Sequence, residues 1–369
     1  MLLLSLERDV LLKPLTMVGG FIEKKHTMPI LSNVYIKKQD NQLTIIANDL
    51  EIQACITITQ NFAGEDFVIT LPQKKLQEIL RVIPEGTQIS LTKQNNKILI
   101  TSGAIKYTIQ SLPADSYPLL KVSESEVCTF HIPQIKLKQM LWQIQYAMAD
   151  KDGRVFLNGM LFETNDNQLK LVATDAHRLG LTTIDLSPQK FAHAHVILPK
   201  KSVLELFRLL DNNENLVTVK IFPNQVYFEC DNRQLLTKII DGKYPSYERV
   251  IPITNDKICI INRVQLLNAV ERVSVIGSDK VKTLTAHFFD NKLSISCTNE
   301  DDETSQDEIE VVYDNVSIQM TFNLLYVRDL LNNSTAEFLQ FALFDDKRSI
   351  LVTVPEQLDF MAVLMPLRI

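Results

Sequence analysis

The chain has 369 residues, of which 46% are hydrophobic and 22% are charged, and its 38 basic and 44 acidic side chains give a net charge of −6. This composition is typical of a folded globular protein and excludes a disordered chain, and no apolar run reaches the ~18 residues that a membrane-spanning helix needs. The acidic balance excludes a general attraction to nucleic acid, so any such contact has to be local. Only ten glycines are present, which argues against phosphate-binding loops and a nucleotide enzyme.

The N-terminal third of the chain predicts a helix, strands, a second helix and a hairpin, in that order. Apolar residues at helical spacing predict the first helix over Glu7 to Gly19. Alternating apolar residues after Asp40 predict a half-buried strand. Leu71 to Leu80 has a proline in its first turn and predicts a short amphipathic helix. Two short alternating runs between Gln88 and Ile100 predict a hairpin around an Asn-Asn turn.

This order of elements recurs twice along the chain. The segment Asp-Asn-Gln-Leu at 40–43 recurs at 166–169 and, with lysine for glutamine, at 290–293, which gives spacings of 126 and 124. The second helix recurs after Leu198 and after Phe322, and further first helices are predicted over Pro133 to Ala147 and Asn262 to Val273. A period of this kind indicates tandem domains. We therefore predict three α+β domains of helices packed on antiparallel sheets, 1–125, 126–253 and 254–369, called repeats 1, 2 and 3.

Positive charge is concentrated on the predicted helices. The six helices carry thirteen basic and six acidic side chains, a net charge of +7, so the remainder of the chain sums to −13. Lysine and arginine are good helix formers on solvated faces, which is one explanation. The alternative is a surface that faces DNA or RNA and contacts phosphates without reading the base sequence.

An acidic run lies in repeat 3, at Glu300 to Glu303 and again at Asp307, Glu308 and Glu310. Such a run is often a solvated loop. It is also suited to a head-to-tail contact with the lysines of repeat 1 in another copy of the chain.

Signals for catalysis and for metal binding are weak. The phosphate-loop, zinc-protease and nucleophile-elbow motifs are absent from the sequence. His193 and His195 could offer two metal nitrogens, but no cysteine or acidic cluster accompanies them, so we predict no metal and no cofactor. Asp175 and His177 could form an acid–base relay, although no nucleophile motif accompanies them. Five scattered cysteines and the absence of a signal-peptide pattern predict a reducing, cytoplasmic location.

Several linked motifs resemble one family along the whole chain. They are Leu-Asn-Gly-Met-Leu-Phe-Glu at 157–163, Ala-Thr-Asp-Ala-His-Arg-Leu at 173–179, Asp-Gly-Lys-Tyr-Pro at 241–245, Thr-Met-Pro-Ile-Leu at 27–31, Phe-Asn at 322–323 and Met-Pro-Leu-Arg-Ile at 365–369. Together they resemble the bacterial sliding clamp, the beta subunit of the DNA polymerase III holoenzyme. The resemblance implies a non-enzymatic processivity factor with the DNA clamp fold.

The resemblance also implies an assembly and a set of partners. Two chains would form a head-to-tail homodimer, a six-domain ring that encircles double-stranded DNA without sequence specificity. Helices would line the hole, which would account for their positive charge. The implied partners are a replicative polymerase subunit, a clamp loader and other proteins with a clamp-binding motif, and no membrane is implied. Family peptides carry a glutamine followed by apolar residues and end in leucine-phenylalanine.

The residues implied by the resemblance fall into three groups. The cleft for partner peptides maps onto Leu157, Thr174, Ala176, His177, Arg178, Leu179, Pro245, Val250, Ser349, Val363, Leu364, Met365, Pro366, Leu367 and Arg368. DNA contacts map onto Lys25, Lys151, Val155, Phe156 and Lys201. The dimer interface is expected at Lys74, Tyr107, Ile109, Val275, Ile276, Glu300, Asp301 and Glu303. Ala176 stands where the family often has glycine, and Ile369 stands where leucine is common.

Two alternatives stay open at this point. One is an enzyme that uses Asp175 and His177 on a repeated β scaffold, whose activity would depend on His177 rather than on the C-terminal residues. The other is a monomeric adaptor that binds peptides without DNA, which the mass of the protein in solution would distinguish from a dimer.

Overall fold

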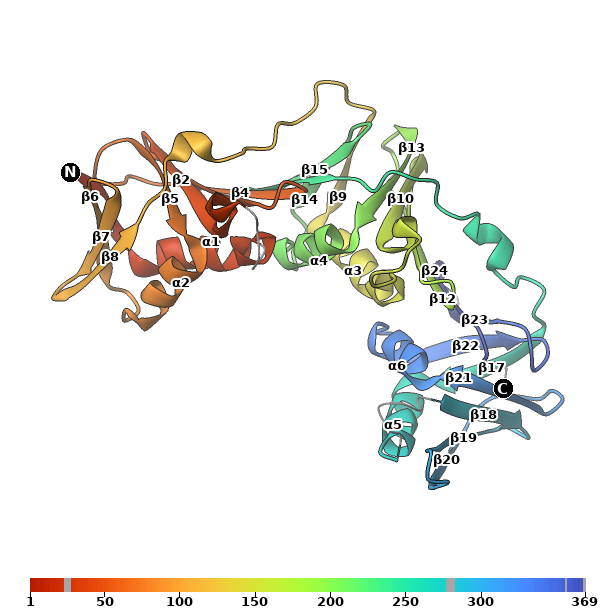
Figure 1. The fold of residues 1–369 in the computed structure, drawn as a ribbon. Coiled ribbons are helices and arrows are strands. Elements are labelled where there is room, and N and C mark those ends of the chain that lie inside the picture. Colours follow the sequence, from red (N-terminus) through yellow and green to blue (C-terminus); the bar gives the residue numbers. More distant parts are fainter. Residues whose placement is uncertain (23–27, 277–282, 356, 368–369) are drawn as a thin grey trace. The chain divides into compact units, whose positions relative to one another are not determined.

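The computed structural model describes residues 1–22, 28–276, 283–355 and 357–367, and Figure 1 shows the chain as a ribbon. The described residues form six α-helices and 24 β-strands. By their contacts they divide into two compact units. Unit 1 is Met1–Lys136 with Leu204–Ile239, and unit 2 is Leu137–Val203 with Ile240–Ile369. Each unit contains one eight-stranded and one four-stranded antiparallel sheet.

The elements follow the same order in each repeat. Repeat 1 contains β1 (Leu2–Glu7), α1 (Arg8–Val18), β2 (Asn33–Gln39), β3 (Gln42–Asn48), β4 (Ile52–Thr59), β5 (Phe67–Pro72), α2 (Gln73–Val82), β6 (Gln88–Gln94), β7 (Lys97–Ser102) and β8 (Ile105–Gln110). Repeat 2 contains β9 (Cys128–Pro133), α3 (Gln134–Ile144), β10 (Gly159–Asp166), β11 (Gln168–Thr174), β12 (Arg178–Asp185), β13 (Phe191–Pro199), α4 (Lys200–Leu209), β14 (Leu216–Ile221), β15 (Gln225–Cys230) and β16 (Arg233–Lys238). Repeat 3 contains β17 (Lys257–Asn262), α5 (Arg263–Ser274), β18 (Thr283–Phe289), β19 (Lys292–Thr298), β20 (Thr304–Glu310), β21 (Ile318–Asn323), α6 (Leu324–Asn332), β22 (Phe338–Leu343), β23 (Ile350–Val354) and β24 (Gln357–Leu364).

The predicted helices are present, with ends shifted by one to three residues. The first helix begins at Arg8 rather than at Glu7, because Glu7 still pairs with β6 as the last residue of β1. The third ends at Ile144 and continues as a 3₁₀ turn, η4 (Gln145–Ala147). Asn262 and Asn323 cap α5 and α6, because each side chain accepts a hydrogen bond from a backbone N–H of the first turn.

The apolar pattern buries one face of each element. In α2, Leu76, Ile79 and Leu80 lie on the buried side, while Lys74 and Lys75 are exposed. This spacing of three and four residues places the apolar side chains on one face of the helix. α1 packs against α2 and against β3 and β4, and α5 packs against α6. These helices therefore cover a sheet face with their apolar side and leave most of their basic residues outside, whereas Arg8 of α1 is buried.

Each eight-stranded sheet joins strands of two repeats. In unit 1 the strand order is β5-β2-β3-β4-β16-β15-β14-β9, and in unit 2 it is β13-β10-β11-β12-β24-β23-β22-β17. The two central pairs have the same register. Ile52 of β4 lies opposite Thr237 of β16, and Arg178 of β12 lies opposite Leu364 of β24. Residues at matching places in the two sheets can therefore be compared one by one.

The four-stranded sheets have exposed edges. Their orders are β1-β6-β7-β8 and β20-β19-β18-β21, so β8 and β20 are edge strands. Edge strands carry unpaired backbone groups and can add a strand from another chain. Within the described part of the chain, none of the helices is long and apolar enough to cross a membrane.

Candidate peptide-docking site

The Thr-Asp-Ala-His-Arg motif forms the tight turn between β11 and β12. Oδ1 of Asp175 accepts hydrogen bonds from the backbone N–H groups of His177, at 2.9 Å, and of Arg178, at 3.0 Å. Ala176 adopts a left-handed conformation with φ of 74°. Thr174 Oγ1 donates to the carbonyl of Arg178 at 2.7 Å and accepts from the N–H of Ala176 at 3.1 Å. The motif thus specifies a turn, and its carboxylate is bonded to backbone groups and to the Arg178 guanidinium group rather than to the His177 ring.

Repeat 1 has the same turn, between β3 and β4. Asp49 Oδ1 accepts from the N–H groups of Glu51 and Ile52 at 2.9 and 2.8 Å, and Leu50 has φ of 77°. A short polar residue followed by a left-handed residue is a standard way to close such a turn. The acid–base relay at Asp175 and His177 therefore has no support from the geometry.

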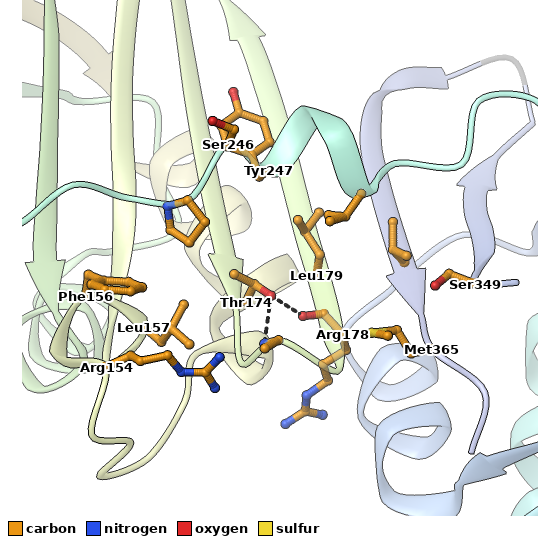
Figure 2. Close-up of a pocket in the computed structure, with 14 residues that line it drawn as sticks. Arg154, Phe156, Leu157, Thr174, Arg178, Leu179, Ser246, Tyr247, Ser349 and Met365 are labelled. Atoms are coloured by element: carbon orange, nitrogen blue, oxygen red, sulfur yellow. Dashed lines mark hydrogen bonds between the residues drawn. The ribbon is translucent and has the colours of Figure 1, made fainter. Parts of the chain in front are cut away.

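An apolar pocket of about 440 Å³ opens beside the turn of repeat 2. Figure 2 shows its 14 lining residues, which come from repeats 2 and 3, all of them within unit 2. They are Arg154, Phe156, Leu157, Thr174, Ala176, Arg178, Leu179, Pro245, Ser246, Tyr247, Val250, Ser349, Val363 and Met365. A mainly apolar pocket with a few polar groups at its margin suits a short peptide with apolar side chains.

Regular elements position the walls of the pocket. Leu179 of β12 lies opposite Val363 of β24, and both side chains are buried. Leu157 comes from a 3₁₀ turn, η5 (Val155–Leu157). The opposite wall is the segment after Pro245, which coils into a further 3₁₀ turn, η6 (Tyr247–Val250). Val250 and Met365 stay about half exposed, at 56% and 46%, so apolar surface is open to a ligand.

The polar margin is held by an ion pair. Nε and a terminal nitrogen of Arg154 donate to the two carboxylate oxygens of Asp152, at 3.0 and 2.9 Å. These hydrogen bonds lower the pKa of Asp152 to about 2. The carboxylate therefore stays charged above this value, and Arg154 stays oriented at the pocket, through the whole neutral range.

Ten of the residues predicted for the cleft line the pocket, and four other predicted residues lie beside it. His177 is exposed, and its carbonyl accepts a hydrogen bond from the N–H of Met365 at 3.1 Å. Leu364 is buried in β24, Leu367 N donates to the carbonyl of Thr321 at 2.7 Å, and Pro366 lies between these last residues. Arg368 lies outside the described residues.

The sequence did not single out Arg154, Ser246 or Tyr247, which also line the pocket. Phe156, predicted as a DNA contact, is a lining residue as well. Tyr247 stands three residues after Tyr244 in a segment without periodicity, so only its position beside the Tyr-Pro pair could have indicated it.

The residues predicted to contact DNA and those predicted to form the dimer interface differ in how exposed they are. Lys151 and Val155 are exposed and Lys201 is half-buried, while Lys25 lies outside the described residues. In the predicted interface, Ile109 is buried within its own unit, and Tyr107 and Ile276 are half-buried. The other five predicted interface residues are exposed, namely Lys74, Val275, Glu300, Asp301 and Glu303.

The candidate metal ligands do not converge. Nδ1 of His193 lies 2.8 Å from the carbonyl of Thr164, and His195 is exposed on the same strand. Among the described residues, no group of three or more histidine, cysteine, aspartate or glutamate side chains could hold a metal ion.

The fold and the pocket define a class of protein, a repeated α+β protein with basic helices and an apolar pocket in unit 2. Comparison with known families is consistent with this class. Three models of the DNA polymerase III beta subunit match the chain in order: the N-terminal domain at residues 2–121, the central domain at 131–246 and the C-terminal domain at 248–368.

Known relatives match the chain from end to end. The beta sliding clamp of Haemophilus influenzae is 34% identical over 365 residues, and that of Escherichia coli K12 is 32% identical, each match covering 99% of both chains. A crystal structure of a Pseudomonas aeruginosa sliding clamp bound to griselimycin has a TM-score of 0.95, with 32% identity over 100% of both chains. The chain therefore belongs to the bacterial beta sliding clamp family, the non-catalytic processivity subunit of DNA polymerase III, and consists of three tandem clamp domains. Membership implies DNA and a DNA polymerase as partners.

Proposed function

We propose that two copies of this chain associate head to tail into a closed ring around double-stranded DNA. The observation that carries this proposal is the pair of edge strands. β8 carries Lys106, and its neighbour β7 carries Lys97, whereas β20 carries Asp307, Glu308 and Glu310. Pairing β8 of one copy with β20 of another would continue both sheets and bring opposite charges together. Val275, 82% exposed at the end of α5, offers apolar surface for the same contact.

Two measurements test the ring. Light scattering after size exclusion should give twice the mass of the 42.1 kDa chain. The assembly should then stay on closed circular DNA and leave linear DNA through its ends, because a ring is held by topology. A single-chain mass with peptide binding intact would instead favour a monomeric adaptor.

We propose that DNA is contacted through phosphates only. Exposed basic side chains on the helices support this, namely Lys13, Lys74, Lys75, Arg81 and Lys136. Lys25→Ala, Lys151→Ala and Lys201→Ala should each shorten residence on nicked DNA modestly and equally for all base sequences, and added salt should shorten it further. A strong base-sequence preference would contradict sliding.

We propose that the pocket of unit 2 docks peptides of a replicative polymerase subunit, the clamp loader and other clamp-binding proteins in the cytoplasm. A peptide tether keeps its owner near DNA by effective concentration. A fluorescein-labelled peptide that carries glutamine and ends in leucine-phenylalanine should bind the wild-type chain in an anisotropy titration. Failure to bind would overturn this assignment. The division into domains 1–125, 126–253 and 254–369 is part of the same proposal.

A further inference from the structure

The Arg178 guanidinium group points away from Thr174 in Figure 2. Four side chains hold it. Its Nε donates to Asp175 Oδ2 at 3.0 Å, and a terminal nitrogen donates to Asp329 Oδ2 at 2.7 Å. Its central carbon lies 4.2 Å from the ring centre of Tyr326 and 5.2 Å from that of Tyr146. These five residues are called the Arg178 cluster.

The Arg178 cluster joins two repeats beneath the pocket. Arg178 and Asp175 belong to the turn that forms the pocket floor, and Tyr146 belongs to η4, so all three are in repeat 2. Tyr326 and Asp329 are on α6 of repeat 3. A helix of one repeat therefore fixes the turn of another through a single guanidinium group.

The charge on Asp329 matters because Arg178 has little water around it. The Arg178 side chain is only 10% exposed. A buried guanidinium group needs charged or polar partners to replace its hydration. Asp175 already accepts two backbone N–H groups through Oδ1, so only its Oδ2 serves the guanidinium. Asp329, 36% exposed, supplies the second charged partner and sets the direction of the guanidinium plane.

Unit 1 has the equivalent positions but not the contact. Ile52 stands at the place of Arg178, as the strand register shows. Glu205 is the sixth residue of α4, as Asp329 is of α6, and it pairs with Arg208 on its own helix. The ion pair between the turn and the following helix is thus present in the unit that has the pocket, whereas the buried Ile52 cannot form one in the other unit.

We propose that Asp329 is a positioning residue for peptide docking. By fixing the Arg178 guanidinium against α6, it holds the turn Thr174–Arg178 in the shape that forms the pocket floor, and peptide affinity depends on this link between repeats 2 and 3. The inference rests on the proposed function of the pocket.

The test is a set of variants titrated with the labelled peptide. Asp329→Asn keeps the shape of the side chain and removes its charge, so affinity should fall roughly threefold to tenfold. Asp329→Glu restores the charge and should bind within about twofold of wild type. Glu337→Gln is the matched control, because it removes one exposed acidic group of repeat 3 that lines no part of the pocket. Solution mass and the thermal midpoint are measured for every variant.

A double-mutant cycle gives an independent readout. Arg178→Lys loses the planar fork and the stacking on Tyr326, so adding Asp329→Asn to it should weaken binding less than the two single losses multiplied together.

Three results would overturn the inference. They are unchanged affinity in Asp329→Asn, equal losses in the Asn and Glu variants, or strictly multiplicative losses in the cycle. A wild-type chain that does not bind the peptide would overturn the proposed function, and this inference with it. A wild-type chain that binds together with an unaffected Asp329→Asn would overturn this inference alone.

Discussion

The segments that follow the two Tyr-Pro pairs differ in how they lie against equivalent eight-stranded sheets. Tyr117-Pro118 and Tyr244-Pro245 both precede a connection that runs beside an eight-stranded sheet. In unit 1 this connection is hydrogen-bonded to the sheet. In unit 2 it coils into η6 and borders the pocket, and it bonds to the sheet through Tyr247, which donates to Glu163, and through Asn255, which donates to the carbonyl of Ala342.

Amide side chains account for the unit 1 arrangement. Gln53 bonds both backbone groups of Leu120, accepting from its N–H at 2.9 Å and donating to its carbonyl at 3.4 Å. Gln225 does the same further along, accepting from the N–H of Ser123 at 3.0 Å and donating to the carbonyl of Lys121 at 3.3 Å. Two glutamines thus act as substitutes for a pairing strand.

Unit 2 has smaller or apolar residues at these places. Strand register aligns Leu179 with Gln53 and Ser349 with Gln225. Leu179 cannot hydrogen-bond the connecting segment, and Ser349 is too short to replace glutamine. The sheet face beside the pocket is therefore apolar. A few substitutions on a repeated framework decide whether a connection covers the sheet or leaves room for a ligand.

Removing residues 365–369 should cause the largest loss of peptide affinity at the unit 2 pocket. Met365 is the C-terminal wall of the pocket, whereas the buried Leu364 ends β24 and is retained. Peptide affinity should fall about a hundredfold or more, because docking of this kind depends on a few anchors. Anisotropy measures the loss, and light scattering and thermal melting should still report a folded dimer. Loss of the dimer together with binding would show that these residues serve the fold.

Leu179→Gln places the unit 1 residue in the pocket of unit 2. Burying an amide where the leucine was 2% exposed should weaken peptide binding roughly tenfold to thirtyfold. Leu216→Gln is the control, since Leu216 is 57% exposed and lies outside the pocket. Equal affinity of the two variants would contradict the role given to the apolar wall.

Gln53→Leu makes the reverse exchange in unit 1. It removes both hydrogen bonds to Leu120, so the free energy of unfolding should fall by about 1–2 kcal/mol while affinity at the unit 2 pocket is unchanged. Denaturant unfolding measures the change, with Gln60→Leu as an exposed control. An equal effect of the two variants would mean that Gln53 does not hold the connection.

Ala176→Gly should have the smallest effect of these variants, and it should stabilise the fold rather than weaken it. Ala176 has a positive φ, so glycine should relieve strain and raise the free energy of unfolding by about 0.5–1 kcal/mol. Leu50→Gly should be destabilising despite the same backbone conformation, because Leu50 packs against Ile30, Leu31 and Tyr117. Thermal melting compares the two, and stabilisation by both would indicate that packing of Leu50 contributes nothing.

Local pattern predicted the elements well. The helix from Leu71 was predicted from one proline and three apolar positions, and the hairpin around Asn95 and Asn96 from strict alternation. β6 (Gln88–Gln94) and β7 (Lys97–Ser102) confirm the hairpin. These signals are short-range, because spacing along the chain alone determines which side chains share a face.

Pairing between repeats could not be predicted in the same way. β4 and β16 are about 180 residues apart, since Ile52 lies opposite Thr237, and neither strand carries a local sign of its partner. The pocket residues were indicated by family resemblance, which missed Arg154 and Tyr247. The link from Arg178 to Asp329 likewise joins distant parts of the chain, in the unit where β12 pairs with β24.

The number of peptides bound per chain tests most directly whether unit 2, and not unit 1, has the docking pocket. Calorimetric titration of the wild-type protein with the unlabelled peptide should give one site per chain, because unit 1 has its own connection where unit 2 has a pocket. Two equivalent sites per chain would contradict the comparison of the units, and no binding at all would contradict the assignment of the pocket.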